Sequence, residues 1–208
     1  MPGASIDRLV DLLTTYRPVG AFNQYRDVHP GLDRCDAASI RVRNLCLYLE
    51  RFSGARFILV GEAAGYAGCR FTGIPFTSEA QITGPEALPW TRGMGLIASS
   101  LRDQPWREAS AQAVWRALGD RADCLLWNAY PWHPYRPARP LSNRAPGREA
   151  RAGSEALCWL LAELPRARPV AVVRTAQGVL SRLGICAHYL RHPSHGGARA
   201  FEAGLAAL

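Results

Sequence analysis

The stretch "RFILVGEAAG", residues 56–65, joins an apolar run of strand length to a glycine-bounded turn that carries a glutamate. Three further runs have strand length: "DCLLWN" at 123–128, "PVAVVR" at 169–174 and "AHYLR" at 187–191. The first three runs are apolar at most positions, which is typical of strands covered on both faces. The sequence therefore predicts four strands, the first of which leads directly into the glutamate turn.

Segments with helical periodicity alternate with these strands. They occupy residues 5–16, 36–52, 107–120, 153–164, 175–184 and 198–208. Such alternation favours a parallel sheet with helices on both of its faces. We therefore expect an α/β protein, a three-layer α/β/α sandwich with a central four-stranded parallel sheet.

A chain of 208 residues, 48% hydrophobic and 20% charged, is long enough to bury a core of its own. We expect a single domain over residues 1–208, with a helical part at 1–50 and a core at 56–208 that carries the motifs. No apolar run approaches the roughly 18 residues of a membrane span, and the start of the chain has acidic residues where a signal peptide would be basic. These features predict a cytoplasmic protein with no membrane partner.

The net charge is +8, and all 25 basic residues are arginine. An arginine-only set either reflects a GC-rich genome or serves bidentate contacts with phosphates, which would suit a polyanionic partner. The six cysteines include no C-x-x-C pair, which argues against a zinc ribbon and an iron–sulfur cluster. We expect mostly buried thiols, no metal site and no cofactor.

In a parallel α/β sheet, ligands bind outside the carboxyl ends of the strands. Long polar loops rich in glycine or proline follow the first, second and fourth predicted strands. They read "GEAAGYAGCRFTGIPF" from residue 61, "WNAYPWHPYRPARPLSNRAPG" from residue 127 and "RHPSHGG" from residue 191. The third strand instead runs directly into a helix. We therefore expect the functional site where the three loops meet.

Three side chains in these loops suit a binding or catalytic role, and each also has a structural alternative. Glu62 in its glycine turn can orient or deprotonate a water, or it can accept backbone N–H groups and hold the loop. Phe76 can stack on a flat ligand, or it can fold back over the core. Asn128 can read an edge that carries both a carbonyl and an N–H group, or it can cap the following turn.

The other polar segments leave similar choices. Trp132 and His133 belong either to a rigid proline-flanked loop or to a wall that faces nucleic acid. The arginines of residues 136–151 either form a solvated face or neutralise phosphates. In "RHPSHGG", His192 is either a structural group or a catalyst, and the two glycines allow close approach of a phosphate. This segment has neither a third zinc ligand nearby nor a G-x-S-x-G elbow.

Taken together, these motifs resemble the uracil-DNA glycosylase superfamily. "GEAAG" and "GIPF" behind the first strand are similar to its G-E-A-P-G and G-x-P-F motifs, and "HPSHGG" behind the last strand contains its H-P-S motif. "WN" at 127–128 and the "RP..NR.P..E" pattern of 139–149 fall where the superfamily has its uracil-reading asparagine and the following loop. The resemblance runs from about residue 56 to the end of the chain, and it implies a central four-stranded parallel sheet between helices.

The resemblance also implies roles for single residues. Glu62 matches the residue that positions the attacking water, Phe76 the ring that stacks on the flipped base, and Asn128 the amide that reads the uracil edge. His192 matches the histidine that donates a hydrogen bond at the O2 side of uracil as negative charge grows there. The further substrate contacts expected are Gly61, Ala63 and Tyr66. The expected DNA contacts are Arg144, Ser194, His195, Gly196, Gly197 and Arg199.

We therefore expect a monofunctional DNA glycosylase of base excision repair that hydrolyses the N-glycosidic bond of uracil in DNA and leaves an abasic site. Its partners would be uracil-containing DNA and free uracil as product, and it would act as a monomer. The chain has no lysine, which excludes a lysine Schiff-base lyase step. The alternatives are a glycosylase for another deaminated base, hypoxanthine or xanthine, and a non-catalytic binder of damaged or abasic DNA. An acyl hydrolase using Ser194 is a third.

The chain departs from the superfamily pattern at several positions. Ala64 replaces the proline of G-E-A-P-G, and the clustered cysteines of the iron–sulfur branch are missing, so we predict no metal cluster. The tyrosine with which some members exclude the thymine methyl group aligns with either Gly65 or Tyr66. The side chain that fills the gap left by a flipped base would be His195 or Arg199.

Overall fold

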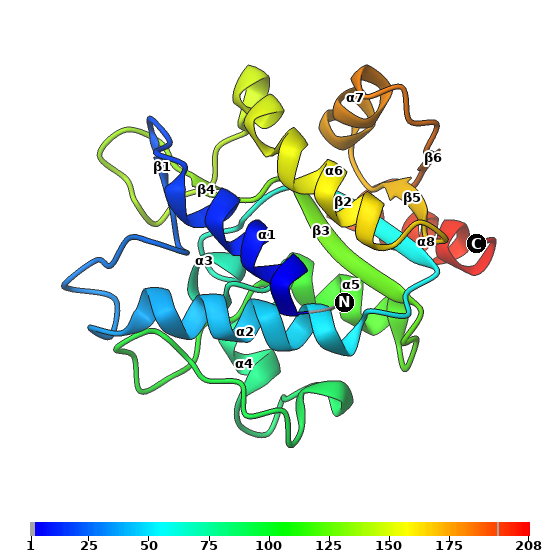
Figure 1. Ribbon diagram of the computed structural model, residues 1–208. Coiled ribbons are helices and arrows are strands. Elements are labelled where there is room, and N and C mark those ends of the chain that lie inside the picture. Colours follow the sequence, from blue (N-terminus) through cyan, green and yellow to red (C-terminus); the bar gives the residue numbers. More distant parts are fainter. Residues whose placement is uncertain (1–2, 195) are drawn as a thin grey trace.

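The computed structural model describes residues 3–194 and 196–208, and its centre is a parallel sheet of four strands (Figure 1). Their order across the sheet is β3-β2-β5-β6. The strands are β2 (Phe57–Ala63), β3 (Cys124–Tyr130), β5 (Arg168–Ala171) and β6 (His188–Tyr189). Each strand overlaps one of the segments predicted to be a strand, and every neighbouring pair is parallel. The predicted four-stranded parallel sheet is therefore confirmed.

Helices cover both faces of this sheet, which confirms the three-layer α/β/α architecture. In Figure 1, α6 (Ser154–Glu163) and α7 (Arg174–Arg182) lie on one side of the sheet. On the other side lie α2 (Ala37–Arg51) and α5 (Ala109–Leu118). All four helices match predicted helical segments to within a few residues.

Both helices near the chain ends also match predicted segments: α1 (Gly3–Thr15) packs against α6, and α8 (Ala198–Ala206) packs against α5. The sequence pattern does not reveal several shorter elements, because each has too few residues to show a period. They are β1 (Ala21–Phe22), α3 (Cys69–Thr72), α4 (Glu79–Ile82), the 3-10 helix η1 (Pro89–Thr91), β4 (His133–Pro134) and the 3-10 helix η2 (Gly147–Gly153). The antiparallel pairing of β1 with β4 ties the loop after β3 to the N-terminal segment.

The register of the sheet brings the motif residues to one edge. Gly61 of β2 lies opposite Asn128 of β3, and Ala63 lies opposite Tyr130. Since the strands are parallel, the turn after β2, Asn128, the start of α7 and the segment after β6 all lie at the carboxyl edge. This edge is where the sequence predicts the site.

The outer edge of β3 is closed by a side chain of α2. In the described part of the chain, no strand lies beyond β3 in the sheet. The Tyr48 hydroxyl accepts a hydrogen bond from the Leu126 N–H (2.6 Å) and donates one to the Leu126 C=O (3.1 Å). Tyr48 is fully buried, and this burial raises the pKa of its hydroxyl. The tyrosine thus satisfies backbone groups at the strand edge and anchors α2 to the sheet.

A buried ion-pair cluster supports the connection between β2 and α5. The Asp33 carboxylate contacts the guanidinium groups of Arg70 (2.6 Å) and Arg41 (2.7 Å), and all three side chains are buried. Burial acts to raise the pKa of Asp33, but the hydrogen bond from Arg70 and the charges of both arginines outweigh it and lower the pKa. Glu79 accepts a hydrogen bond from the Ser99 N–H (2.9 Å) in the same region. Because removing one partner of a buried pair costs about 3–5 kcal/mol, this cluster holds the segment that carries "GIPF" firmly.

One cluster of buried hydrophobic side chains extends from Ile6 in α1 to Leu205 in α8. It includes each residue of 57–60 in β2, as expected for a strand covered on both faces. The single-domain organisation, with parts at 1–50 and 56–208, stays a prediction that this continuous core supports. None of the helices in residues 3–194 and 196–208 combines the length and the apolar character needed to cross a membrane.

Candidate active site

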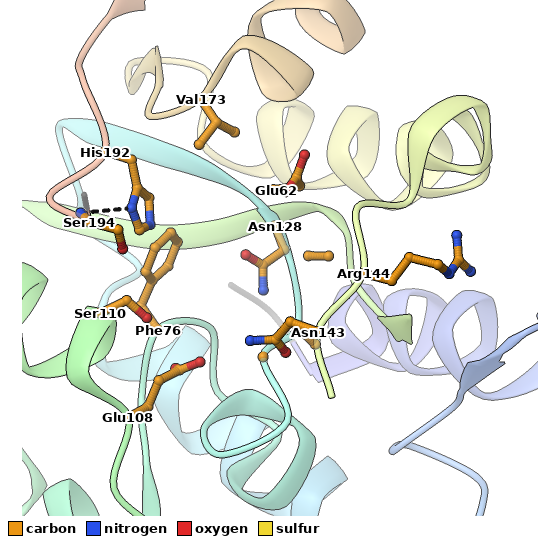
Figure 2. A pocket seen from close by; sticks show the side chains of 13 residues that line it. Glu62, Phe76, Glu108, Ser110, Asn128, Asn143, Arg144, Val173, His192 and Ser194 are labelled. Atoms are coloured by element: carbon orange, nitrogen blue, oxygen red, sulfur yellow. Dashed lines mark hydrogen bonds between the residues drawn. The ribbon is translucent and has the colours of Figure 1, made fainter. Parts of the chain in front are cut away.

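A pocket of about 380 Å³ opens at the carboxyl edge of the sheet (Figure 2). Its walls come from the turn after β2, the "GIPF" segment, β3, the loop after β4, the segment after β6, and the residues that border α5 and α7. The three loops predicted to meet therefore do meet. The predicted site residues that line the pocket are Glu62, Ala63, Phe76, Asn128, Arg144, His192 and Ser194.

Phe76 forms one flat wall of the pocket. Its backbone has a φ of +53°, a left-handed conformation that is rare for a bulky residue and marks a constrained turn. A hydrogen bond within the turn supports this conformation, since Thr72 Oγ1 donates to the Thr77 C=O (2.7 Å). Gly61 lies directly against the ring, because a Cβ atom at Gly61 would overlap it. The ring is thus held where a flat ligand can stack on it.

Asn128 lies beside this ring, with 3% of its surface exposed. Its Oδ1 atom lies over Gly61, 3.1 Å from the position that a Cβ atom would take there. Within residues 3–194 and 196–208, the Asn128 amide forms no hydrogen bond. The amide faces the pocket, where a ligand edge with a carbonyl and an N–H group can pair with it.

The His192 ring is oriented by the segment that follows it. The Ser194 N–H donates a hydrogen bond to His192 Nδ1 (3.1 Å), so a neutral ring carries its proton on Nε2. The ring lies 6.1 Å from the Phe76 ring, centroid to centroid, at an interplanar angle of 32°. This tautomer makes Nε2 a hydrogen-bond donor at the pocket wall next to Phe76.

The Glu62 carboxylate is held by a residue that the sequence does not mark. Thr175 Oγ1 donates a hydrogen bond to Glu62 Oε1 (2.5 Å). Thr175 lies in the first turn of α7, where the positive end of the helix dipole favours a negative group. Val173, the residue before α7, lines the pocket next to Glu62. The signal in the sequence is indirect: the third strand runs straight into a helix, which brings that helix start to the ligand edge.

Glu108, the residue before α5, contributes a second carboxyl group to the pocket. The carboxyl packs against the turn after β2 so closely that a Cβ atom at Gly65 or at Gly68 would overlap it. Burial raises the pKa of Glu108 to about 7. No motif contains Glu108, so sequence reasoning misses it, and Ser110 in the first turn of α5 is missed for the same reason.

Arg144 lines the pocket, but contacts within the protein hold its guanidinium group. It donates to the Gly20 C=O (3.0 Å) and forms an ion pair with Glu149 (2.9 Å). The neighbouring Asn143 accepts a hydrogen bond from the Tyr66 N–H (3.0 Å) through its Oδ1 atom. Asn143 therefore joins the turn after β2 to the loop after β4, and it also lines the pocket.

Tyr66 is not among the residues that line the pocket, whereas Gly65 is. The Tyr66 ring instead lies edge-on to Trp106, with centroids 6.0 Å apart and an interplanar angle of 85°. The Tyr66 side chain therefore lies outside the pocket lining, and its contact with substrate stays a prediction. Gly61 packs directly against Phe76 and Asn128, two residues of the pocket wall.

The predicted DNA contacts after β6 lie in different environments. Gly197 is buried and donates its N–H to the Ser194 C=O (3.2 Å), which closes the turn. Gly196 is exposed with a φ of +76°, and Arg199 is exposed on α8. Neither lines the pocket. His195, predicted both as a DNA contact and as a filler of the gap left by a flipped base, lies outside the described residues.

Trp132 and His133 belong to the protein interior, with exposed fractions of 2% and 0%. The His133 ring nitrogens are hydrogen-bonded to the Ala64 C=O (2.9 Å) and the Pro140 C=O (3.0 Å). Burial lowers the pKa of His133. The rigid-loop interpretation is therefore correct for this pair, and a wall that faces nucleic acid is wrong, because both side chains are turned inward.

The arginine-rich loop offers positive charge to solvent. Arg136, Arg139 and Arg148 are exposed, and none forms an ion pair within residues 3–194 and 196–208. Arg144, between Arg139 and Arg148 in the same segment, extends to the pocket wall. The three exposed arginines can therefore contact phosphates without first breaking ion pairs.

The expectation of mostly buried thiols is wrong. Cys69 and Cys124 are buried, but Cys35, Cys158 and Cys186 are exposed. The exposed cysteines lie in loops and on the outer face of α6, where a small side chain needs no buried environment. Among the described residues, no group of three or more His, Cys, Asp or Glu side chains is arranged to hold a metal ion.

No protein-family model matches the chain, and no curated protein matches it. Among solved structures, the chain is similar to the crystal structure of wild-type SMUG2 from Pedobacter heparinus, with a TM-score of 0.60 and 12% sequence identity. The match covers 98% of this chain and 95% of that chain. It confirms the uracil-DNA glycosylase-like fold that the motifs imply. At this identity the likeness establishes the fold, and the reaction has to be argued from the pocket.

Proposed function

We propose that the protein is a monofunctional DNA glycosylase of base excision repair, which hydrolyses uracil from DNA and leaves an abasic site. The observation that carries the proposal is the pocket that brings Glu62, Phe76, Asn128 and His192 together. The likeness in fold to SMUG2 supports it. The proposed enzyme acts as a monomer in the cytoplasm and needs no cofactor.

In this proposal the uracil leaves the duplex and enters the pocket. Flipping a base out costs a few kcal/mol, which stacking and edge hydrogen bonds offset. The ring stacks on Phe76, and the Asn128 amide donates to the O4 carbonyl and accepts from the N3–H group. Cytosine presents an amino group at the same position, so a donor would face a donor. The buried and otherwise unpaired amide of Asn128 makes that mismatch costly.

The glycosidic bond breaks as its electron pair moves onto the base, which leaves a cationic sugar and an anionic uracil. His192 Nε2–H donates to the O2 carbonyl, where the negative charge develops. Removing one such donor typically costs a factor of about 10²–10³ in rate. Glu62, held by Thr175, orients a water whose oxygen bonds to C1′ of the sugar and whose released proton is accepted by the carboxylate. The negative charge of Glu62 also stabilises the cationic sugar.

The DNA strand would lie across the mouth of the pocket. Ser194 and the turn that follows it would lie beside the phosphates, and the exposed Arg136, Arg139 and Arg148 would neutralise them. Because these contacts displace counterions, binding should weaken steeply as the salt concentration rises. This contribution does not depend on the base, so base selection rests with the pocket.

The direct test is release of free base from an oligonucleotide that contains one uracil, in the presence of a metal chelator. The wild-type protein should release uracil and leave an abasic site, and Glu62→Gln should slow excision far more than it weakens DNA binding. Glu202→Gln on the exposed face of α8 is the matched control and should leave the rate unchanged. Parallel substrates with hypoxanthine or xanthine test the alternative substrates. Intact uracil DNA at high enzyme excess would refute the proposal, and retention of abasic DNA without turnover would favour a damage binder.

A further inference from the structure

Glu108 is a carboxyl group that the proposed reaction does not use. Figure 2 shows it on the side of the pocket where Asn143 lies, with Asn128 between this side and Glu62. Two glycines, Gly65 and Gly68, leave room for its carboxyl group, because any side chain at either position would overlap it. The backbone of the turn after β2 is therefore shaped around Glu108.

The Glu108 carboxyl group is half-buried in the pocket wall and has no partner among the described residues. Within residues 3–194 and 196–208 it forms no hydrogen bond and no ion pair, although it is enclosed by protein on the side of the β2 turn. Loss of solvent without a compensating partner disfavours the charged form of a carboxyl group and favours the neutral acid. A neutral carboxyl group in a pocket has one O–H donor to offer to a ligand.

The charged and titratable groups around Glu108 do not supply a partner. Cys69 of α3 is a buried neighbour of Glu108. Its thiol stays neutral because burial raises the pKa of the thiol to about 12. Arg107, the preceding residue, is paired with Glu86 (2.6 Å), and Arg144 of the facing loop is paired with Glu149 (2.9 Å).

Two further titratable groups, Glu62 and His192, line the same pocket. Each is engaged elsewhere, Glu62 by Thr175 and His192 by the Ser194 N–H. Burial is the sole cause of the raised pKa of Glu108. Because no neighbouring charge stabilises its anion, the neutral acid dominates below a pH of about 7.

We propose that Glu108 is a specificity-determining residue that donates a hydrogen bond from its carboxylic acid O–H to a carbonyl oxygen of the bound base. This inference rests on the proposed function, since it assigns a further contact to the same ligand. The Glu108 contact favours bases whose carbonyl oxygen faces the pocket wall at Gly65. A base with an amino group there would meet a second donor and would be disfavoured.

Uracil binding should depend on pH because the pKa of Glu108 is raised. The pKa of Glu108 is raised to about 7, so the donating acid is present at pH 6 and is lost as the pH rises through 7. Between pH 6 and pH 8 the protonated fraction falls about tenfold. Affinity for free uracil, and kcat/KM for uracil DNA, should fall by the same factor.

The test compares the wild-type protein with Glu108→Gln and Glu108→Ala. Glutamine keeps the shape and an N–H donor but does not titrate, so its affinity for free uracil should be equal at pH 6 and pH 8. Alanine should lose about tenfold or more at pH 6. Glu202→Gln, the control on α8, should retain the wild-type profile. If Glu108→Gln shows the same fall as the wild type, or binds as weakly as Glu108→Ala at pH 6, the proposal is wrong.

A second measurement needs no variant. Calorimetric titration of the wild-type protein with uracil at pH 8, in buffers of different ionisation enthalpy, should show uptake of close to one proton per uracil bound. Binding without proton uptake overturns the role of Glu108 but leaves the glycosylase proposal intact. Binding with uptake, but without base release from DNA, refutes the glycosylase and leaves the Glu108 contact standing.

Discussion

Replacing Thr175 by Val should slow uracil excision without weakening DNA binding. The side chains have nearly the same shape, but valine lacks the hydroxyl that donates to Glu62 Oε1 at 2.5 Å. A hydrogen bond to a charged group contributes about 1.5–3 kcal/mol, which corresponds to a factor of about 10–150 in rate if the bond is needed to orient the carboxylate in the transition state. Because Glu62 acts on the water and the sugar, the loss should fall on kcat rather than on KM.

The measurement is single-turnover release of uracil from an oligonucleotide at saturating enzyme, with DNA binding followed separately by fluorescence anisotropy. Thr175→Ser is the matched control, since it keeps the hydroxyl and should retain most of the rate. If Thr175 had only a structural role, Thr175→Val and Thr175→Ser would each lose activity in proportion to their loss of stability against unfolding. Full activity of Thr175→Val, alongside an inactive Glu62→Gln, would show that Glu62 needs no positioning by α7 and would refute this reasoning.

Two further predictions concern recognition and stability. Asn128→Asp should lower the excision of uracil about 100-fold or more, because a carboxylate cannot donate to O4, and the ratio of uracil to cytosine release measures the effect. An unchanged ratio would remove Asn128 from base reading. Tyr48→Phe should lower the free energy of unfolding by about 1–3 kcal/mol, since the N–H and C=O of Leu126 lose their partner at the edge of β3. Urea denaturation measures this loss, and excision at 25 °C should persist because Tyr48 does not line the pocket.

The fold was predictable because its strands are buried on both faces and therefore appear as continuous apolar runs. Residues 57–60 are all buried in the core, and the parallel pairing places Gly61 opposite Asn128. Once the strands are known to be parallel, the loops that follow them have to lie at one edge. The strand pattern was therefore sufficient to predict that the loops with Glu62, Phe76 and His192 meet, and all three residues line one pocket.

The missed residues depend on contacts that no local pattern encodes. Thr175 reaches Glu62 because α7 starts at the ligand edge, a contact between residues 113 positions apart in the chain. Glu108 reaches Gly65 through the packing of α5 against the turn after β2. Tyr66 shows the converse: its position in the motif suggests the pocket, whereas its ring packs against Trp106. Side-chain direction in a turn follows from tertiary packing and is not fixed by position in a motif.

The two glutamates of the pocket show how environment can divide one chemical group into two roles. Glu62 accepts a hydrogen bond from the Thr175 hydroxyl at the start of α7, which orients its carboxyl group for the proposed contact with water and sugar. Glu108 has no such donor among the described residues and packs against glycine backbone, which stabilises the neutral acid that can donate to a carbonyl. Thr175→Val acts on Glu62, and Glu108→Gln acts on Glu108. If the two groups act independently, the change in kcat/KM of the double variant should be the product of the changes in the two single variants.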